Sequence, residues 1–374
     1  MKATQRLFPR CVWREPSFWR SASLALLISS AGPSGQCAPA ERKAPPRLDR
    51  NNLLTYLNSA GEIAPVDSIA DWQKRRAAIL AAMQRVMGPL PGTEKRCALD
   101  VRVEEERDCG SYLQRFITYA SEPGSRVPAY LLIPKRALGG LEKLPGVLCL
   151  HPTHALGQKV VAGLGGSPND EYGVELASRG YIILAPAYPL LANYQPDLKA
   201  LGYQSGTMKA IWDNTRGLDL LASLPFVKTN GFGAIGHSLG GHNSIYTAAF
   251  DERIKVIVSS CGFDSYLDYM DGDIKGWTSE RYMPKLAEYA PAEIPFDFHE
   301  IIAALAPRLC FISAPFGDTN FKWRSVDQVV KAAAPVYQLY GAPKNLRVEH
   351  PDGGHSFPPE MRQLAYRLLD ENLK

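Results

Sequence analysis

The stretch that decides the fold is Phe232-Gly233-Ala234-Ile235-Gly236-His237-Ser238-Leu239-Gly240-Gly241. Its first half is apolar and predicts a buried strand, and its second half predicts the start of a helix. Gly236, Ser238 and Gly240 form a G-x-S-x-G pattern, which is typical of a serine on a sharp strand-to-helix turn. Such a turn forces the serine to a positive φ, and the glycines let strand and helix pack closely. We therefore expect Ser238 to project above a sheet edge as a nucleophile, with the Leu239 N–H facing a developing oxyanion.

Length and composition indicate one large folded domain. The chain has 374 residues, of which 45% are hydrophobic and 21% charged, so it can bury a large core. Its formal net charge is +4, but residues 1–40 carry five Lys or Arg against one Glu, and the remainder carries 37 basic and 37 acidic residues. This balance leaves no excess charge to attract nucleic acid or an anionic membrane, and we expect neither as a partner.

Residues 1–40 have the pattern of an export signal. Arginines come first, the apolar run Leu24-Ala25-Leu26-Leu27-Ile28 follows, and small residues lead to Ala38-Pro39-Ala40. The apolar run is too short to span a bilayer. We expect residues 1–40 to be removed on export, which places the mature chain in the periplasm or outside the cell without membrane insertion. A lipid anchor at Cys37 and an unstructured tail are the alternatives.

Five cysteines remain after residue 40, and this odd number excludes a complete disulfide framework. Cys97 and Cys109 flank one polar strand and are the pair that an oxidising compartment would allow to join. The other three lie in or at the end of apolar strands and are predicted core residues: Cys149, Cys261 and Cys310.

From residue 146 onward, short apolar runs alternate with helical patterns. The expected strands are 146–150, 181–185, 232–235, 254–259, 309–313 and 346–349. The expected helices are 169–179, 207–224, 244–250, 325–333 and 358–373. This alternation predicts a mostly parallel, doubly wound sheet covered on both faces. Because ligands bind at the carboxyl ends of parallel strands, the residues that follow these strands are the site candidates.

The upstream part of the chain has a different pattern. Residues 41–60, rich in Pro and Asn, predict an exposed arm, and residues 68–87 predict an amphipathic helix. Three strand-like runs at 98–106, 112–120 and 127–133 predict an antiparallel N-terminal edge of the sheet. We therefore divide the chain after residue 40 into an N-terminal arm and helix, 41–96, and a main domain, 97–374.

Residues 263–306 interrupt the alternation and are predicted to form an inserted, cap-like segment. This insertion is rich in aromatic residues: Tyr266, Tyr269, Trp277, Tyr282, Tyr289, Phe296 and Phe298. Long loops on an α/β sheet are usually functional or mobile. We expect most of these aromatics to pack the insertion onto the body. Trp277, and Tyr188 from a second irregular segment at 188–206, are the candidates for substrate contact.

A nucleophilic serine needs a base and a group that orients the base. A turn of this type is followed in the chain first by the acid and then by the histidine. His355 lies in a glycine-rich loop between the last strand and the C-terminal helix, and it is the predicted base. Asp318, directly after strand 309–313, is the predicted acid, and Asp264, after the preceding strand, is its rival.

The loop after strand 146–150 is expected to supply a second oxyanion donor. Pro152 has no N–H, so the Thr153 N–H is the predicted donor and His154 is the alternative. The two histidines of this loop are three residues apart without an accompanying Cys, Asp or Glu cluster, so the spacing predicts no metal site. The glycine-rich residues 162–166 are not followed by Lys-Ser/Thr, which excludes a phosphate-binding P-loop. We expect no cofactor.

With these motifs the sequence resembles the α/β-hydrolase superfamily from about residue 112 to the C-terminus. The motifs are Gly236-His237-Ser238-Leu239-Gly240-Gly241, Gly317-Asp318 and Gly354-His355-Ser356-Phe357. Three features resemble the bacterial dienelactone-hydrolase and acetyl-xylan-esterase-like branch of this superfamily. They are the N-terminal helix with antiparallel strands, Leu150-His151-Pro152-Thr153, and Glu175-Leu176-Ala177-Ser178-Arg179-Gly180-Tyr181. The resemblance implies an α/β-hydrolase fold with Ser238 as nucleophile, Asp318 as acid and His355 as base. Dienelactone hydrolases proper use a cysteine nucleophile, so a serine here favours an esterase.

The expected function is that of a secreted serine hydrolase that cleaves carboxylic esters through an acyl-enzyme. Its expected substrate is a small-molecule or oligosaccharide ester, with acyl or uronate esters on polysaccharides as candidates because sugars stack on aromatic faces. An exopeptidase of the prolyl-oligopeptidase type is one alternative, weakened because residues 41–111 are too few to build a propeller domain. A catalytically silent hydrolase fold used for binding is another. The sequence leaves the oligomeric state open.

Overall fold

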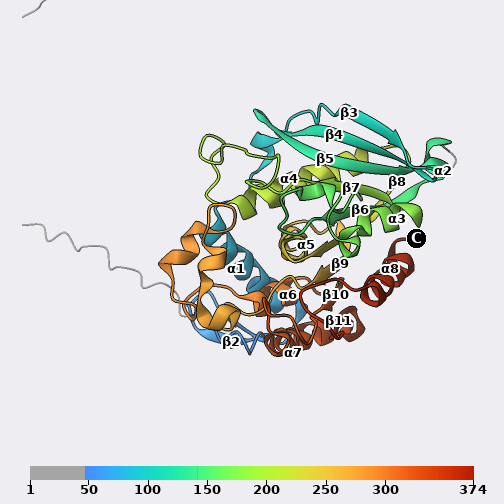
Figure 1. Cartoon of the computed structure of the whole chain (residues 1–374). Helices are drawn as coiled ribbons and strands as arrows, with labels where there is room; N and C mark the ends of the chain where they lie inside the picture. The colour runs from blue at the N-terminus through green and yellow to red at the C-terminus, as the bar shows by residue number, and fades with distance from the viewer. Residues whose placement is uncertain (1–46, 141) are drawn as a thin grey trace, which may run out of the picture. The chain divides into compact units, whose positions relative to one another are not determined.

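A nine-stranded sheet runs through the part of the chain that the computed structural model describes, residues 47–140 and 142–374 (Figure 1). Its order is β11-β10-β9-β8-β6-β7-β5-β4-β3, in which the first six strands are parallel and the last three are joined antiparallel. The strands are β3 (Arg102–Asp108), β4 (Tyr112–Glu122), β5 (Ser125–Pro134), β6 (Leu144–Leu150), β7 (Ile182–Pro186), β8 (Val227–His237), β9 (Ile254–Ser260), β10 (Leu309–Ser313) and β11 (Leu346–Glu349). The predicted signal, residues 1–40, lies outside the described residues.

Helices cover both faces of this sheet (Figure 1). On one face lie α1 (Ile69–Met87), α4 (Gly206–Ser223), α5 (Leu239–Phe250), α6 (Phe298–Ala304) and α7 (Trp323–Leu339). On the other lie α3 (Tyr172–Ser178) and α8 (Pro359–Leu373), and α2 (Lys135–Leu138) is a single turn after β5. The predicted doubly wound sheet with an antiparallel edge is confirmed.

The central strand β6 shows why the apolar runs form this sheet. Leu148 and Leu150 pack with the helices of the first face, whereas Val147 and Cys149 pack with α3 and α8. A strand that is buried on both faces reads as a continuous apolar run, because every side chain enters one core or the other. The edge strand β3 is the opposite case, since it is exposed along its whole length and rich in charge, which discourages pairing with another chain.

Helix α7 is longer than the sequence predicts. The sequence predicts an end at residue 333, but the observed helix contains Pro335, which has no N–H to donate to the preceding turn. The helix continues to Leu339, and Val336 and Tyr337, beyond the proline, are buried in the core. Burial of these two side chains outweighs the lost hydrogen bond. Across the described residues, no helix combines the length and the apolar character that a membrane crossing requires.

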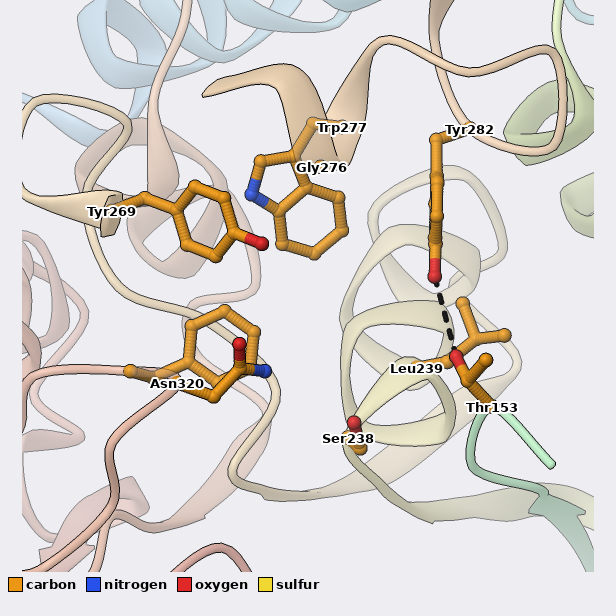
Figure 2. A pocket seen from close by; sticks show the side chains of 9 residues that line it. Thr153, Ser238, Leu239, Tyr269, Gly276, Trp277, Tyr282 and Asn320 are labelled. Atoms are coloured by element: carbon orange, nitrogen blue, oxygen red, sulfur yellow. Dashed lines mark hydrogen bonds between the residues drawn. The ribbon is translucent and has the colours of Figure 1, made fainter. Parts of the chain in front are cut away.

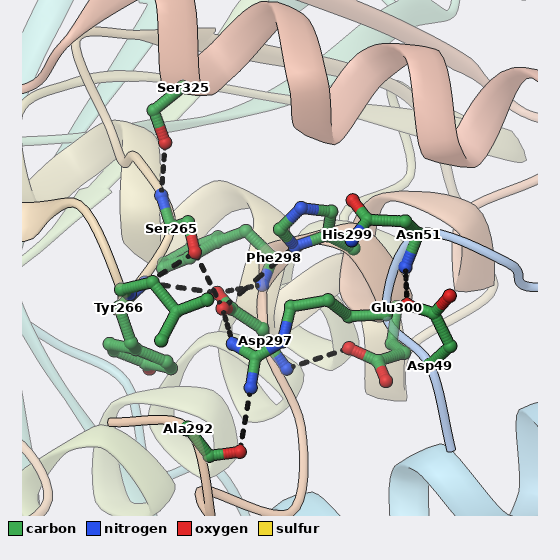
Figure 3. Close-up of polar contacts among 12 residues, drawn as sticks. Asp49, Asn51, Ser265, Tyr266, Ala292, Asp297, Phe298, His299, Glu300 and Ser325 are labelled. Carbon is green, nitrogen blue, oxygen red and sulfur yellow. Dashed lines mark hydrogen bonds and ion pairs between the residues drawn. The ribbon is translucent and has the colours of Figure 1, made fainter. Parts of the chain in front are cut away.

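The expectation of an exposed N-terminal arm is wrong from Arg47 onward. Leu48 and Leu53 are buried, and β1 (Thr55–Leu57) pairs with β2 (Ile63–Pro65) in a small hairpin. Arg50 reaches Asp297 at the start of α6, and Figure 3 shows Asp297 at the centre of a buried polar cluster.

The residues around this cluster explain its stability. Asp297 also accepts hydrogen bonds from the Ser265 hydroxyl at 2.8 Å and from the Phe298 N–H at 2.7 Å. Arg47 pairs with Glu300 one turn further along α6. The start of the described chain is therefore fastened to the insertion by buried ion pairs.

The insertion itself has little regular structure before α6. It forms three short 3₁₀ turns, η4 (Tyr269–Gly272), η5 (Ile274–Trp277) and η6 (Pro284–Glu288). As expected, most of its aromatic side chains pack inward. The thiols of Cys97 and Cys109 are both free, so the disulfide allowed by their spacing is not formed.

Candidate active site

Ser238 stands at the junction between β8 and α5, in the conformation that the G-x-S-x-G pattern predicts. Its φ is 54° and its ψ is −120°, a strained conformation for a residue with a side chain. Two backbone hydrogen bonds hold the turn, from the Ser238 N–H to the Ser260 carbonyl at 2.8 Å and from the His242 N–H to the Ser238 carbonyl at 3.0 Å. The neighbouring strand β9 and the first turn of α5 therefore fix the position of the serine.

The glycines of the pattern are required by close approach rather than by their own φ. A Cβ on Gly236 would lie 2.1 Å from the carbonyl carbon of Gly240, and a Cβ on Gly240 would lie 1.8 Å from the carbonyl oxygen of Leu150. Both contacts are with backbone, which cannot move aside cheaply. The first turn of α5 can thus pack against β8 and β6 only if both positions lack side chains.

The structure brings Ser238, His355 and Asp318 into one chain of hydrogen bonds. The Nε2 of His355 lies 2.9 Å from the Oγ of Ser238. Its Nδ1 lies 2.9 and 3.0 Å from the two carboxylate oxygens of Asp318. The three residues follow β8, β10 and β11, so they meet at the carboxyl edge of the parallel sheet although 117 positions separate the serine from the histidine.

The electrostatic environment keeps Asp318 ionised. Burial would raise the pKa of its carboxyl, but hydrogen bonds from His355 and from the Asn320 and Phe321 N–H groups outweigh burial and hold the pKa below its usual value. The backbone bonds also fix the orientation of the carboxylate. An ionised Asp318 can accept a hydrogen bond from the Nδ1–H of His355 and stabilise a positive charge on the imidazole.

The adjacent His237 does not compete for this role. Its ring centroid is 4.9 Å from that of His355. Burial, followed by the nearby charge of His355, lowers the pKa of His237 to about 3. It is therefore neutral at working pH and packs beside the base.

The remaining candidates for base and acid are engaged elsewhere. His350 bonds the Ala314 carbonyl and Asp327, at 2.7 and 2.8 Å. Asp264, the rival acid, accepts the Lys322 N–H at 3.0 Å, and its other oxygen has no hydrogen-bond partner among the described residues. The structure thus joins His355 to Asp318 and leaves Asp264 behind the loop that carries Asp318.

A pocket of about 160 Å³ opens beside Ser238 (Figure 2). Its wall consists of Thr153, Ser238, Leu239, Tyr269, Gly276, Trp277, Tyr282, Asn320 and Phe321. None of these lining residues is charged. Four of the nine lining residues are aromatic, and the Trp277 ring lies 5.2 Å from that of Tyr282 and 6.1 Å from that of Phe321, centroid to centroid. Such a wall suits a neutral ring that can stack on aromatic faces.

Both predicted oxyanion residues line this pocket. Leu239 is the first residue of α5, so its N–H is one of the N–H groups that a helix leaves unbonded. Thr153 follows β6, and its hydroxyl lies 3.3 Å from that of Tyr282 (Figure 2). They stand beside Ser238, where an oxyanion would form.

The two predicted substrate contacts lie differently. Trp277 lines the pocket, but Tyr188 is buried behind it. The Tyr188 hydroxyl donates to the Arg281 carbonyl at 3.1 Å, and its ring packs 6.3 Å from that of Tyr282. Tyr188 therefore supports a wall residue instead of lining the pocket, because its hydroxyl is used inside the protein.

Sequence reasoning did not assign Tyr269, Tyr282, Asn320 and Phe321 to the wall. The first two belong to the aromatic-rich insertion, so composition carried part of the signal. Asn320 and Phe321 lie two and three residues after Asp318, in the same loop. Their closeness in sequence to the predicted acid was the only feature that could have indicated a place in the pocket wall.

The sequence is similar to known proteins over part or most of its length. The prolyl oligopeptidase family (Peptidase_S9) matches residues 172–301, which is less than half of the chain. The "Putative hydrolase YtaP" of Bacillus subtilis (strain 168) is 26% identical over 301 residues, covering 77% of this chain and 96% of that protein.

Solved structures share the fold. A glucuronoyl esterase from Solibacter usitatus superposes with a TM-score of 0.67 at 17% identity, covering 87% of this chain and 98% of that one. A carbohydrate esterase family 15 glucuronoyl esterase from Caldicellulosiruptor kristjansonii does so with a TM-score of 0.62 at 20% identity, covering 85% and 88%. The sheet, the helices on both faces and these neighbours define the α/β-hydrolase fold. The chain has the α/β-hydrolase fold and is an enzyme of the hydrolase class.

Proposed function

We propose that the protein is a serine esterase that cleaves carboxylic esters through an acyl-enzyme. The observation that carries this proposal is the hydrogen-bond chain from Ser238 through His355 to Asp318, set on a positive-φ turn beside a pocket. A serine hydroxyl is a weak nucleophile until an adjacent base takes its proton. The chain supplies that base at 2.9 Å.

The reaction follows from the positions of the atoms. Nε2 of His355 takes the proton of Ser238 as Oγ attacks the ester carbonyl, and Asp318 stabilises the imidazolium through Nδ1. The Leu239 and Thr153 N–H groups stabilise the oxyanion. His355 then gives the proton to the departing alcohol, which leaves the acyl group on Ser238. Water, activated by the same histidine, attacks the acyl-enzyme and restores the serine.

The pocket wall supports a sugar ester as substrate. It offers aromatic faces, which stack on sugar rings, and no charged side chain that would bind a free carboxylate. Structures of the same fold are named glucuronoyl esterases, in agreement with a uronate or acyl ester on a polysaccharide. We therefore place the substrate among oligosaccharide esters, with small-molecule esters as simpler substitutes.

The test is a hydrolysis assay with the purified chain. We expect p-nitrophenyl acetate to be turned over by the wild type and about 10⁴–10⁶-fold more slowly by Ser238→Ala. A screen against acetylated, feruloylated and methyl-glucuronate oligosaccharides then identifies the ester. Wild-type turnover by Ser238→Ala, or no turnover of any ester, would contradict the proposal and favour a binding protein.

A peptidase is the second candidate, because the prolyl oligopeptidase family matches residues 172–301. The same serine, histidine and aspartate would serve both reactions, so the site alone does not separate them. Aminoacyl-p-nitroanilides do: we expect turnover of the acetate ester at least tenfold above that of any anilide. The reverse ratio would assign the site to peptide bonds.

We also propose that the chain is exported and loses residues 1–40. The support is the order of arginines, apolar run and small residues in that segment. N-terminal sequencing of the protein recovered from outside the cytoplasm should begin near residue 41. Recovery of the intact N-terminus from the cytoplasm alone would exclude export.

A further inference from the structure

A thiol lies directly behind the predicted acid and base. The Cys261 Sγ, a carboxylate oxygen of Asp318 and a ring nitrogen of His355 all lie within 4.8 Å of one another. Among the described residues this is the one group of three or more His, Cys, Asp or Glu side chains with metal-ligand spacing. Its members follow three different strands, so no spacing in the sequence could reveal it.

The backbone holds Cys261 in this position. It follows β9 with a φ of 48°, and its N–H donates to the Ser313 carbonyl at the end of β10, at 2.9 Å. Its thiol faces the Ser356 carbonyl, beside His355, at 3.5 Å. Contacts with the end of β10 and with the loop that carries His355 therefore fix the sulfur at the carboxyl edge of the sheet.

We propose that Cys261, Asp318 and His355 form an inhibitory site for a thiophilic divalent cation such as Zn²⁺ or Cd²⁺. Thiolate, imidazole and carboxylate are the three ligand types that zinc prefers, and three protein ligands with water in the fourth position are common. Burial raises the pKa of the Cys261 thiol well above its usual value, so the cation must displace the thiol proton. Transition-metal ions bound to thiols do so.

The distances allow this site with small movements. Tetrahedral bonds of about 2.0 Å to nitrogen and oxygen separate those two ligand atoms by about 3.3 Å. The Nδ1 of His355 lies 2.9 Å from the nearer oxygen of Asp318, so the pair must part by only a few tenths of an ångström. A sulfur ligand at about 2.3 Å requires a shift on the order of 1 Å from the 4.8 Å limit.

A cation at this site would disable the base. It takes the lone pair of Nδ1, and the imidazole proton moves to Nε2, which then faces Ser238 as a donor. The Cys261 thiol becomes a thiolate and releases one proton to solvent, and no electron is transferred. His355 can then no longer accept the proton of Ser238. This consequence for activity rests on the proposed function, whereas cation binding does not.

The cation has a route to the site. About 27% of the His355 side chain is exposed, whereas only 1% of the Asp318 side chain is. The ion therefore approaches along the exposed side of the imidazole and meets the buried sulfur and carboxylate behind it. The other cysteines of the main core, Cys149 and Cys310, are buried outside this group and provide matched controls.

Binding is tested first by titration of Cd²⁺ into the full chain, followed by the ultraviolet charge-transfer band of cadmium thiolate. We expect both Cys261→Ala and Cys261→Ser to lose the absorbance that one bound Cd²⁺ per protein contributes to this band. Circular dichroism should show that each variant is folded. Cys310→Ala and Ser238→Ala should keep that absorbance. The Ser238→Ala variant separates cation binding from activity, since its band would remain even if the proposed esterase function failed.

Inhibition is tested with Zn²⁺ and p-nitrophenyl acetate, each variant being compared with its own metal-free rate. We expect Zn²⁺ to inhibit the wild type and Cys310→Ala reversibly, with recovery after EDTA. Cys261→Ala should require about 100-fold more Zn²⁺ for the same fractional inhibition, because one of three protein ligands is lost. A cadmium-thiolate band and a sensitivity to Zn²⁺ in the Cys261 variants equal to those of the wild type would overturn the proposal.

Discussion

Asp318 holds His355 through both of its carboxylate oxygens, at 2.9 and 3.0 Å from the same ring nitrogen. This contact selects one tautomer, with the proton on Nδ1 and the lone pair of Nε2 facing Ser238. Two backbone N–H groups of the loop keep the carboxylate in place. These hydrogen bonds indicate that Asp318 orients His355 and does not itself attack the substrate. Mutation of Asp318 can therefore test its role separately from that of Ser238.

We expect Asp318→Asn to lower kcat by about 10²–10⁴-fold with little change in KM, because the amide favours the wrong tautomer of His355 while the pocket wall stays intact. The measurement is steady-state kinetics on p-nitrophenyl acetate. Asp264→Asn is the control, since Asp264 bonds the Lys322 N–H. A large kcat loss confined to Asp264→Asn would move the acid to the earlier strand.

The sequence could predict which residues meet at the sheet edge, and it favoured Asp318 over Asp264 as the acid, but it could not show which of the two carboxylates contacts the histidine. Asp318 and Asp264 each follow an apolar strand, and the sequence contains no record of which carboxylate faces the histidine. The aromatic wall was harder still, since residues of the insertion have no periodicity that marks one side as exposed. Tyr188 shows the limit, because an aromatic in a loop beside the site is equally suited to line the pocket or to support it.

Long-range ion pairs were beyond the sequence as well. The pair between Arg50 and Asp297 joins residues 247 positions apart, and the Pro- and Asn-rich composition around Arg50 is typical of an exposed arm. The parallel strands, in contrast, could be placed within a few residues. Burial on both faces makes each one a continuous apolar run, which is a local signal.

We expect His355→Ala to be nearly as damaging as Ser238→Ala, because the serine and its base act as one unit. His350→Ala is the matched control, since that histidine also follows β11 but bonds Asp327 and the Ala314 carbonyl. Labelling by a fluorophosphonate probe, together with kcat, measures both variants. Loss of labelling in His350→Ala with normal labelling in His355→Ala would reverse the assignment.

Gly240→Ala should prevent the turn from packing. Its Cβ would lie 1.8 Å from the Leu150 carbonyl oxygen, so backbone must move, and we expect the free energy of unfolding to fall by about 3 kcal/mol or more. Gly139→Ala is the control, because that Cβ meets nothing closer than 4.0 Å and the residue has a φ of −72°. Urea denaturation compares the two. Equal stability in both variants would show that the turn can relax.

Arg50→Ala is expected to lower the free energy of unfolding by about 3–5 kcal/mol, because it leaves the buried carboxylate of Asp297 without its cation. Arg102→Ala removes an ion pair whose partners, Arg102 and Asp100, are both more than half exposed, and it should leave the denaturant midpoint nearly unchanged. Denaturant midpoints of the two variants give the comparison. A similar small cost in both would show that the N-terminal segment contributes little to stability.

The carboxyl group of Asp264 should make the stability of the protein depend on pH. Burial raises the pKa of its carboxyl from 3.8 to about 7, with the nearby Asp268 and Asp297 also raising it and the Lys322 N–H and charge lowering it. The folded state therefore binds a proton between about pH 4 and pH 7 that the unfolded state does not. Since the unfolded state binds fewer protons over this range, the free energy of unfolding must fall as the pH rises.

We expect this residue to lower the free energy of unfolding by about 2–4 kcal/mol between pH 5 and pH 8, since each unit of pKa shift corresponds to about 1.4 kcal/mol. Asp264→Asn carries no titrating proton and can still accept the Lys322 N–H. Its stability should therefore decline less than that of the wild type over the same range, with the difference largest above pH 7. Urea unfolding at pH 5, 6, 7 and 8 measures both proteins. Parallel curves for the two would mean that Asp264 is ionised throughout and that its unpartnered oxygen is solvated in solution.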